Sequence, residues 1–129
     1  MKILIVDDSL MDRKIVMSLL RRSGIYNDIY EATDGVEGLK ILSSHYKEIV
    51  LIVLDWQMPN MNGIDFMKSV VQIPETVKIP IIMVTASGSE VDKELARNVN
   101  PHLAGYIVKP YQPNVFLKMI QPFLKVNTD

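Results

Sequence analysis

Five polar residues whose types could do chemistry together stand at the ends of short apolar runs. Asp7 and Asp8 follow the first run, Asp55 the third, Thr85 the fourth and Lys109 the fifth. A single polar residue at such a place is most simply a helix cap or a solvated chain end. Four runs that end this way in one short chain instead indicate a shared site with three carboxylates, one hydroxyl and one ammonium.

The residue types in this group predict a phosphate chemistry assisted by a metal ion. Carboxylates that lie close together repel one another unless a cation joins them. Oxygen ligands without histidine or cysteine suit Mg²⁺ or Mn²⁺ rather than zinc, and Mg²⁺ commonly couples carboxylates to a phosphate oxygen. A carboxylate can itself accept a phosphoryl group, while Lys109 and Thr85 could hold further phosphoryl oxygens. The group therefore predicts in-line phosphoryl transfer.

Alternating strands and helices must position these residues. Apolar runs predict strands at Ile3–Val6, Ile29–Ala32, Ile49–Leu54, Ile79–Val84 and Tyr106–Val108. Helical spacing predicts helices between Ser9 and Gly24 and over residues 35–44, 64–72, 89–98 and 112–124. The inner side of the last helix is expected to carry Val115, Phe116, Met119, Ile120 and Phe123. Ser9 and Asp12 have the spacing of a capping box.

The spacing of the predicted strands identifies the fold class as α/β. Successive strands end about 23–30 residues apart, which is the length of a βα unit. Five units are too few for an eight-unit barrel, and right-handed crossovers place helices on both faces of an open parallel sheet. Ligands of such sheets bind outside the carboxyl ends of the strands. We therefore expect the five polar residues at one sheet edge.

Composition bounds the classes of function that remain. A length of 129 residues fits one domain, and 48% hydrophobic with 22% charged residues excludes a disordered or fibrous chain. Fifteen acids against fourteen bases give a net charge of −1, which argues against nonspecific nucleic-acid or membrane binding. The chain has no cysteine, and its first apolar run is too short for a signal peptide or membrane span. We expect a cytoplasmic protein.

The ordered set of motifs resembles the receiver domain of two-component response regulators, in particular the stand-alone regulators of chemotaxis. The motifs occur in order between residue 2 and about residue 124, and they are Asp7-Asp8, Asp55 with Met58-Pro59 and Gly63, Thr85-Ala86, and Tyr106 with Lys109-Pro110. The resemblance implies a flavodoxin-like, doubly wound sheet with strand order 2-1-3-4-5. It also implies a receiver domain over residues 1–125, followed by a polar tail at 126–129.

The resemblance assigns a role to each residue at the expected sheet edge. Asp55 would accept a phosphoryl group from a histidine kinase or a phosphotransfer protein. Asp8, Asp55 and the backbone carbonyl of Gln57 would ligate Mg²⁺ or Mn²⁺, with Asp7 acting through a bound water. Lys109 would pair with Asp55 and then with the phosphoryl group.

The resemblance also implies a switch and an output surface. Thr85 would move toward the phosphoryl group, Tyr106 would turn inward behind it, Gly63 would be structural, and the bond before Pro110 would be cis. Output would be the binding of a partner protein through residues 89–98, 106–108 and 112–124, by a monomer or a weak, phosphorylation-dependent dimer. The protein would accept and slowly lose a phosphoryl group and would not be a turnover enzyme.

Three other interpretations remain open from the sequence. The chain could be a receiver fragment of a longer regulator or hybrid kinase, although Met1 and the polar end favour a free-standing protein. A phosphatase with an aspartate nucleophile usually carries an Asp-x-Asp motif after its first strand, which Asp7-Asp8-Ser9 lacks. A flavodoxin-like cofactor binder would need a first loop that attracts phosphate, whereas two adjacent acids repel it. One departure from the family is residues 98–105, which exceed the usual turn by about two residues.

Overall fold

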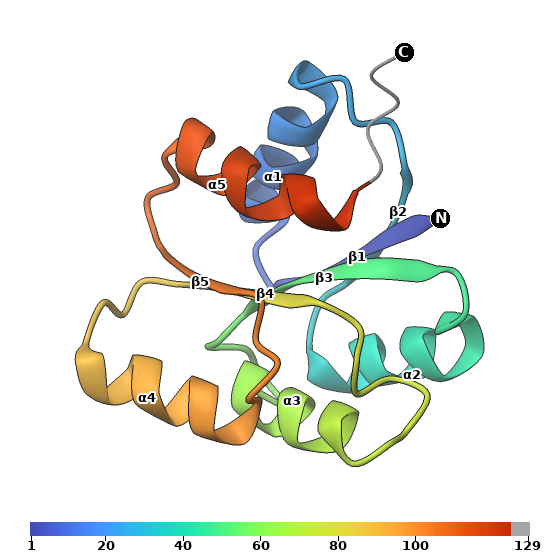
Figure 1. Cartoon of the computed structure of the whole chain (residues 1–129), viewed down its shortest axis with the longest axis vertical. Coiled ribbons are helices and arrows are strands. Elements are labelled where there is room, and N and C mark those ends of the chain that lie inside the picture. The colour runs from blue at the N-terminus through green and yellow to red at the C-terminus, as the bar shows by residue number, and fades with distance from the viewer. Residues whose placement is uncertain (125–129) are drawn as a thin grey trace.

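The computed structural model describes residues 1–124, which form a five-stranded parallel sheet covered by helices on both faces (Figure 1). The predicted tail at 126–129 lies outside the described residues. The strand order is β2-β1-β3-β4-β5, as the resemblance implies. The elements are β1 (Lys2–Val6), α1 (Leu10–Arg22), β2 (Asp28–Ala32), α2 (Gly35–His45), β3 (Ile49–Asp55), α3 (Gly63–Val71), β4 (Ile81–Thr85), α4 (Glu90–Val99), β5 (Gly105–Val108) and α5 (Pro113–Ile120).

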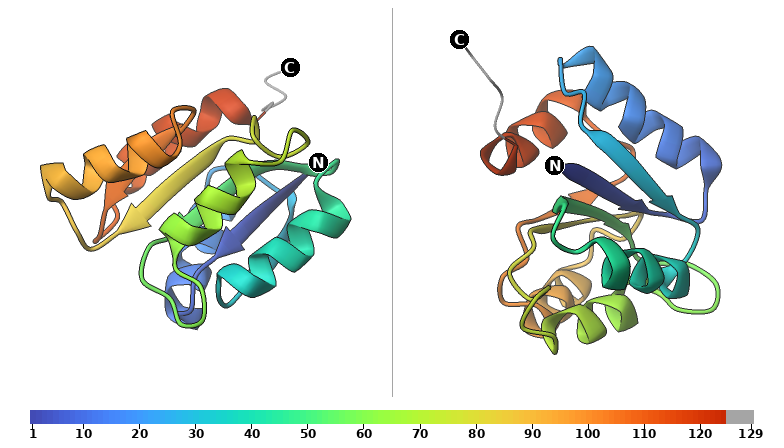
Figure 2. Two further views of the ribbon diagram at one scale, coloured as in Figure 1. Left: turned by 90° about the horizontal axis from the view of Figure 1, so that it is seen from below. Right: turned by 90° about the vertical axis from the view of Figure 1, so that its right-hand side faces the viewer.

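Two apolar cores hold the layers together. Helices α1 and α5 cover one face of the sheet, and α2, α3 and α4 cover the other (Figures 1 and 2). Alternate strand residues point to opposite faces, so Ile3 and Ile5 pack toward α1 and α5, while Leu4 and Val6 pack toward α2 and α3. Because both faces are covered, the central strands are apolar between their ends, as in residues 3–6, 49–54 and 81–84. The predicted α/β class and doubly wound arrangement are confirmed.

Side-chain caps fix where four of the helices begin. Ser9, Asp34, Asn62 and Ser89 each accept a hydrogen bond from the backbone N–H three residues later. Such caps satisfy N–H groups that a helix cannot bond internally. Each helix therefore starts soon after the strand before it, at the carboxyl edge of the sheet.

None of the helices within residues 1–124 is long and apolar enough to cross a membrane.

Two predicted boundaries are wrong by two residues or more, and proline accounts for both. β4 begins at Ile81 rather than Ile79, because Pro80 has no N–H to donate to a ladder and Ile79 closes a turn onto the carbonyl of Thr76. The final α-helix ends at Ile120, and residues Gln121–Phe123 form a 3₁₀ turn, because Pro122 cannot continue the helical hydrogen bonds.

One residue of α5 faces solvent, whereas the prediction placed it on the inner side of the helix. Val115 was expected on the inner side of this helix, but 46% of its surface is exposed. Phe116 and Ile120, which are expected on the same inner side, are fully buried and carry the packing of α5 against the sheet. Val115 therefore belongs to the outer surface of the helix.

The long connection between α4 and β5 is anchored by a buried asparagine. Asn100 is 1% exposed, and its amide nitrogen lies 3.9 Å from the sulfur of Met67 in α3. Its side-chain oxygen accepts a hydrogen bond from the N–H of His102, and its carbonyl accepts one from the N–H of Leu103. The extra residues of this loop are therefore tied to the core beneath α4.

Gly63 brings the chain back against the end of β3. Its N–H donates to the carbonyl of Trp56 at 2.7 Å, and a Cβ at this position would collide with the carbonyl oxygen of Asp55. The loop before it turns through Asn60, which has φ of 66°. A residue without a side chain is thus needed where α3 starts, directly beside the last residue of β3.

We expect Gly63→Ala to destabilise the protein by at least about 2 kcal/mol, because backbone must move to make room for the new methyl group. Urea unfolding followed by circular dichroism measures this change. Gly88→Ala is the matched control, since a Cβ there meets only Val108 side-chain atoms at ordinary contact distance. Equal stabilities for the two variants would contradict the account of Gly63.

Candidate functional site

The sheet topology brings three acids together at one edge. β2 pairs with one side of β1, and β3 pairs with the other side. The order of the strands therefore reverses direction between β1 and β3, and open α/β sheets bind their ligands at such a point. Val6 pairs with Leu54, so Asp7 and Asp55 extend from neighbouring strands at the same level. Asp7, Asp8 and Asp55 each offer a carboxylate oxygen, and these oxygens all lie within 4.8 Å of one another. The arrangement expected from the sequence is present.

The three acids differ in their access to solvent. Asp7 is 4% exposed and Asp55 is 8% exposed, whereas Asp8 is exposed. Gln57 is also exposed, in the loop that follows β3. Two carboxylates of the site, those of Asp7 and Asp55, are therefore buried. Asp8 and Gln57 lie on its solvent-facing side, where a small ligand can enter.

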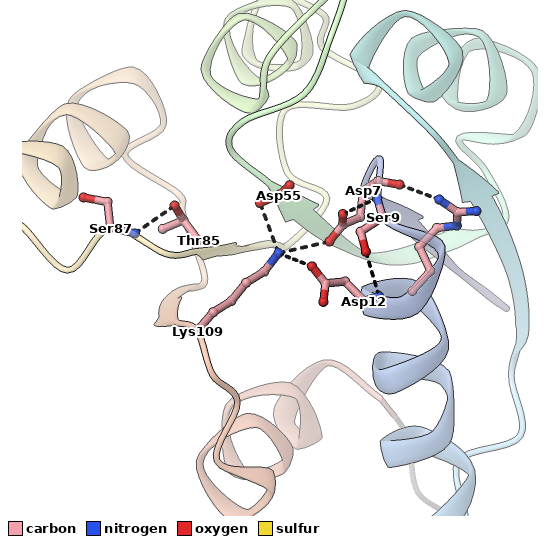
Figure 3. A network of polar contacts seen from close by, with 8 residues as sticks. Asp7, Ser9, Asp12, Asp55, Thr85, Ser87 and Lys109 are labelled. Carbon is pink, nitrogen blue, oxygen red and sulfur yellow. Dashed lines mark hydrogen bonds and ion pairs between the residues drawn. The ribbon is translucent and has the colours of Figure 1, made fainter.

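Lys109, directly after β5, reaches into this cluster. Its ammonium nitrogen lies 3.5 Å from Oδ1 of Asp55 and 3.4 Å from Oδ2 of Asp7 (Figure 3). Its shortest contact, 2.7 Å, is with Oδ2 of Asp12. The Lys109–Pro110 peptide bond is cis. One ammonium thus faces three carboxylates from three different elements of the fold.

Asp12 is a site residue that the sequence reasoning missed. The spacing of Ser9 and Asp12 predicts a reciprocal capping box, but only half of it forms. The Ser9 hydroxyl accepts from the N–H of Asp12 at 3.2 Å, while the N–H of Ser9 donates to Oδ1 of Asp7 at 2.9 Å. The Asp12 carboxylate points to Lys109 instead. The available signal was its position, since an acid in the first turn of α1 must lie near the edge where that helix starts.

Arg13 is a second missed residue, and it holds the backbone that carries Asp7. Only 8% of its surface is exposed, which is unusual for an arginine. Its Nη1 donates to the carbonyl of Asp7 at 2.7 Å, and its Nε donates to Glu31 of β2 at 2.9 Å. Arg13 therefore ties the end of β1 to α1 and β2.

The electrostatics of the site reflect excess negative charge. Burial and the neighbouring Asp7 carboxylate raise the pKa of Asp55 and the Lys109 ammonium lowers it, with a net pKa of about 6. Burial likewise raises the pKa of Asp7 above its ordinary value. For Lys109, burial lowers the pKa, but the hydrogen bond to Asp12 and the charges of Asp55 and Asp7 outweigh it, so the net pKa is raised. The ammonium stays protonated.

Thr85 and Tyr106 both contact the same residue of the loop between β4 and α4. Thr85 Oγ1 accepts from the N–H of Ser87 at 3.2 Å, and the Tyr106 hydroxyl donates to the carbonyl of Ser87 at 2.7 Å. Tyr106 is half-buried, and burial raises the pKa of its hydroxyl. Ser87 thus links the end of β4 to β5.

Comparison with known proteins matches the chain along nearly its whole length. The model of the response regulator receiver domain matches residues 3–121. The chain is 42% identical to the chemotaxis protein CheY1 of Helicobacter pylori over 129 residues, which cover 98% of this chain and 99% of that protein.

Solved structures agree with this match. One is the CheX-CheY-BeF3-Mg+2 complex from Borrelia burgdorferi, with a TM-score of 0.84, 27% identity and coverage of 96% of this chain and 90% of that chain. Another is the Mn(2+)-bound form of response regulator Rcp1, with a TM-score of 0.77, 26% identity and coverage of 97% and 96%. The chain belongs to the response regulator receiver domain family.

Proposed function

We propose that this protein is a phosphoacceptor in a two-component phosphorelay of the chemotaxis type, working in the cytoplasm, and that Asp55 receives the phosphoryl group. The observation that carries the proposal is the setting of Asp55. Its carboxylate is buried beside Asp7, has an oxygen within 4.8 Å of one of Asp8, and lies 3.5 Å from the Lys109 ammonium. An anionic nucleophile, further oxygen ligands and a fixed cation are the parts that phosphoryl transfer needs.

The transfer step follows from these positions. A carboxylate oxygen of Asp55 attacks phosphorus, the bond from phosphorus to the histidine nitrogen of the kinase or phosphotransfer protein breaks, and the nitrogen keeps its electron pair. Lys109 then pairs with the phosphoryl oxygens as a point charge. Because the product stays covalently on Asp55 until water removes it, the protein serves as a signal carrier rather than a turnover enzyme.

The donors fit Mg²⁺ or Mn²⁺ as cofactor. Two buried acids with raised pKa values and a third exposed acid make a hard, oxygen-only site with unbalanced negative charge. Asp8, Asp55 and the carbonyl of Gln57 would hold the ion, and Asp7 would act through a water. When bound, the ion neutralises charge on the carboxylates and the phosphoryl group. Two structural neighbours, a manganese-bound form and a beryllofluoride–magnesium complex, support Mg²⁺ or Mn²⁺ as the ion.

The change at Asp55 would reach a partner through the surface of α4, β5 and α5. Thr85 would turn toward the phosphoryl group and lose its hydrogen bond from the N–H of Ser87. The carbonyl of Ser87 also accepts a hydrogen bond from Tyr106, so this change would reach β5. This is a shift between two states biased by one covalent charge. Exposed apolar side chains on this surface offer contact area for a partner protein, and they are Val91, Leu95, Val108 and Val115.

We expect acetyl phosphate with Mg²⁺ to add about 80 Da to the protein, the mass of one phosphoryl group, in a label that mild base removes. Intact-protein mass spectrometry measures it. Asp55→Asn should remove the label, EDTA should prevent it, and Asp65→Asn, an exposed aspartate of α3, should keep it. A label that persists in Asp55→Asn, or steady turnover of small phosphate esters, would contradict the proposal.

The charge balance predicts an unusual pH dependence of stability without metal. Native Asp55 binds its proton more tightly than the unfolded chain does, so the free energy of unfolding falls as pH rises from about 4 to about 6. Asp55→Asn should therefore be more stable than wild type by about 1–3 kcal/mol near pH 7.5 in EDTA, with the gap closing near pH 4. Urea unfolding at the two pH values measures both proteins.

Added Mg²⁺ is the control for this stability prediction. The ion should stabilise wild type more than Asp55→Asn, because the variant lacks one of the three carboxylates. A variant that is less stable than wild type in EDTA at every pH would show that the native site tolerates the charge of Asp55.

The proposed route through Ser87 predicts a local change in amide hydrogen exchange. Beryllofluoride with Mg²⁺ should alter exchange in residues 86–99 and 105–108 of wild type, and leave α2 unchanged. Thr85→Ala should still bind beryllofluoride but lose most of the change in residues 86–99, because the hydroxyl that contacts Ser87 is gone. A full response in this variant would rule out Thr85 as the link.

A further inference from the structure

The shortest ionic contact of the site joins two residues whose pairing the proposed transfer step does not use. Lys109 lies 2.7 Å from Asp12, against 3.4 Å from Asp7 and 3.5 Å from Asp55 (Figure 3). Asp12 belongs to α1, while the other two acids belong to the sheet edge. The side chains of Asp12 and Lys109 are 27% and 19% exposed, so water screens this pair only in part.

The carboxylate of Asp12 can pair with Lys109 because it does not cap the N-terminus of α1. In a reciprocal capping box its carboxylate would accept the N–H of Ser9, but that N–H donates to Asp7 instead. The hydroxyl of Ser9 still accepts the N–H of Asp12, which fixes the first turn of α1 and the place of the Asp12 side chain. The backbone thus presents this carboxylate to Lys109.

We propose that Asp12 is a positioning residue that holds Lys109 toward α1 while Asp55 is unmodified, and that it competes with the phosphoryl group for the same ammonium. This inference rests on the function proposed above. In this account Asp12 sets how strongly the site retains a phosphoryl group on Asp55.

The competition follows from the donors available. An ammonium is one point charge with three N–H donors, and here three carboxylates already share it. A phosphoryl group brings further negative charge and three strong acceptor oxygens. Lys109 must loosen its contact with Asp12 to move closer to those oxygens. Removing the charge of Asp12 takes away the nearest competitor for the ammonium and leaves only the longer contacts to Asp7 and Asp55.

The same pair acts in the opposite direction on a bound metal ion. While Asp12 neutralises Lys109, a cation that enters among Asp7, Asp8 and Asp55 meets less repulsion from the ammonium. Without that carboxylate, more of the positive charge of Lys109 is left to repel a cation at the metal site. Loss of Asp12 should therefore weaken binding of Mg²⁺ alone and strengthen binding of a phosphoryl mimic.

The test is Asp12→Asn, which keeps the shape of the side chain and removes its charge. The fluorescence of Trp56, the single tryptophan, follows titration with Mg²⁺ alone and then with beryllofluoride at saturating Mg²⁺. We expect Mg²⁺ to bind about threefold more weakly and beryllofluoride about fivefold more tightly, factors typical of a partly exposed ion pair.

Two matched variants separate this effect from other causes. Asp12→Glu keeps the charge at the same place and should restore affinities close to those of wild type. Asp65→Asn removes an aspartate from the first turn of α3, where it lies 4.0 Å from Lys68, and controls for the loss of one negative charge. It should change neither affinity by more than the error of measurement at physiological salt, where remote charges are screened.

The outcomes distinguish this inference from the proposed function. Opposite shifts in Asp12→Asn, reversed in Asp12→Glu, support the competition. Affinities equal to those of wild type, or a loss of both, overturn it, and in either case tight binding by wild type leaves the role of Asp55 standing. If wild type itself binds no beryllofluoride, the proposed function fails and this inference fails with it.

Discussion

Repulsion between two buried carboxylates is the constraint on which the rest of the site depends. Asp7 and Asp55 lie side by side at the ends of β1 and β3, with burial and mutual charge raising the pKa of Asp55 to about 6. Burying like charges is costly unless a cation compensates them. The ammonium of Lys109 compensates part of this negative charge. Together with the exposed carboxylate of Asp8, the two buried acids offer oxygen ligands for a metal ion. The site is therefore unbalanced without a ligand and suited to accept one.

A rigid scaffold is needed to keep such a site from relaxing. The two acids are attached to central strands whose side chains are buried on both faces, and Arg13 fixes the carbonyl of Asp7. Gly63 packs directly against the carbonyl of Asp55. Because these elements cannot move apart easily, the charges are relieved by binding or by chemistry rather than by rearrangement of the sheet.

The sequence predicted those features of the fold and site that depend on the ends of strands. Asp7, Asp8 and Asp55 each follow an apolar run, and parallel strands bring such residues to one edge. Asp12 could not be found this way, since its role depends on which of two hydrogen bonds Ser9 makes. The end of α5 was missed because helical spacing alone does not take account of Pro122. The exposure of Val115 was missed because spacing alone does not show that Phe116, its neighbour, takes the buried position.

The central claim is that Asp55 carries the phosphoryl group. Borohydride reduces an aspartyl phosphate to homoserine, so peptide mapping after treatment with acetyl phosphate, Mg²⁺ and borohydride identifies the modified residue directly. The account predicts homoserine at position 55, dependent on Mg²⁺. Homoserine at position 7 or 8, or none in a fully folded sample, would contradict it.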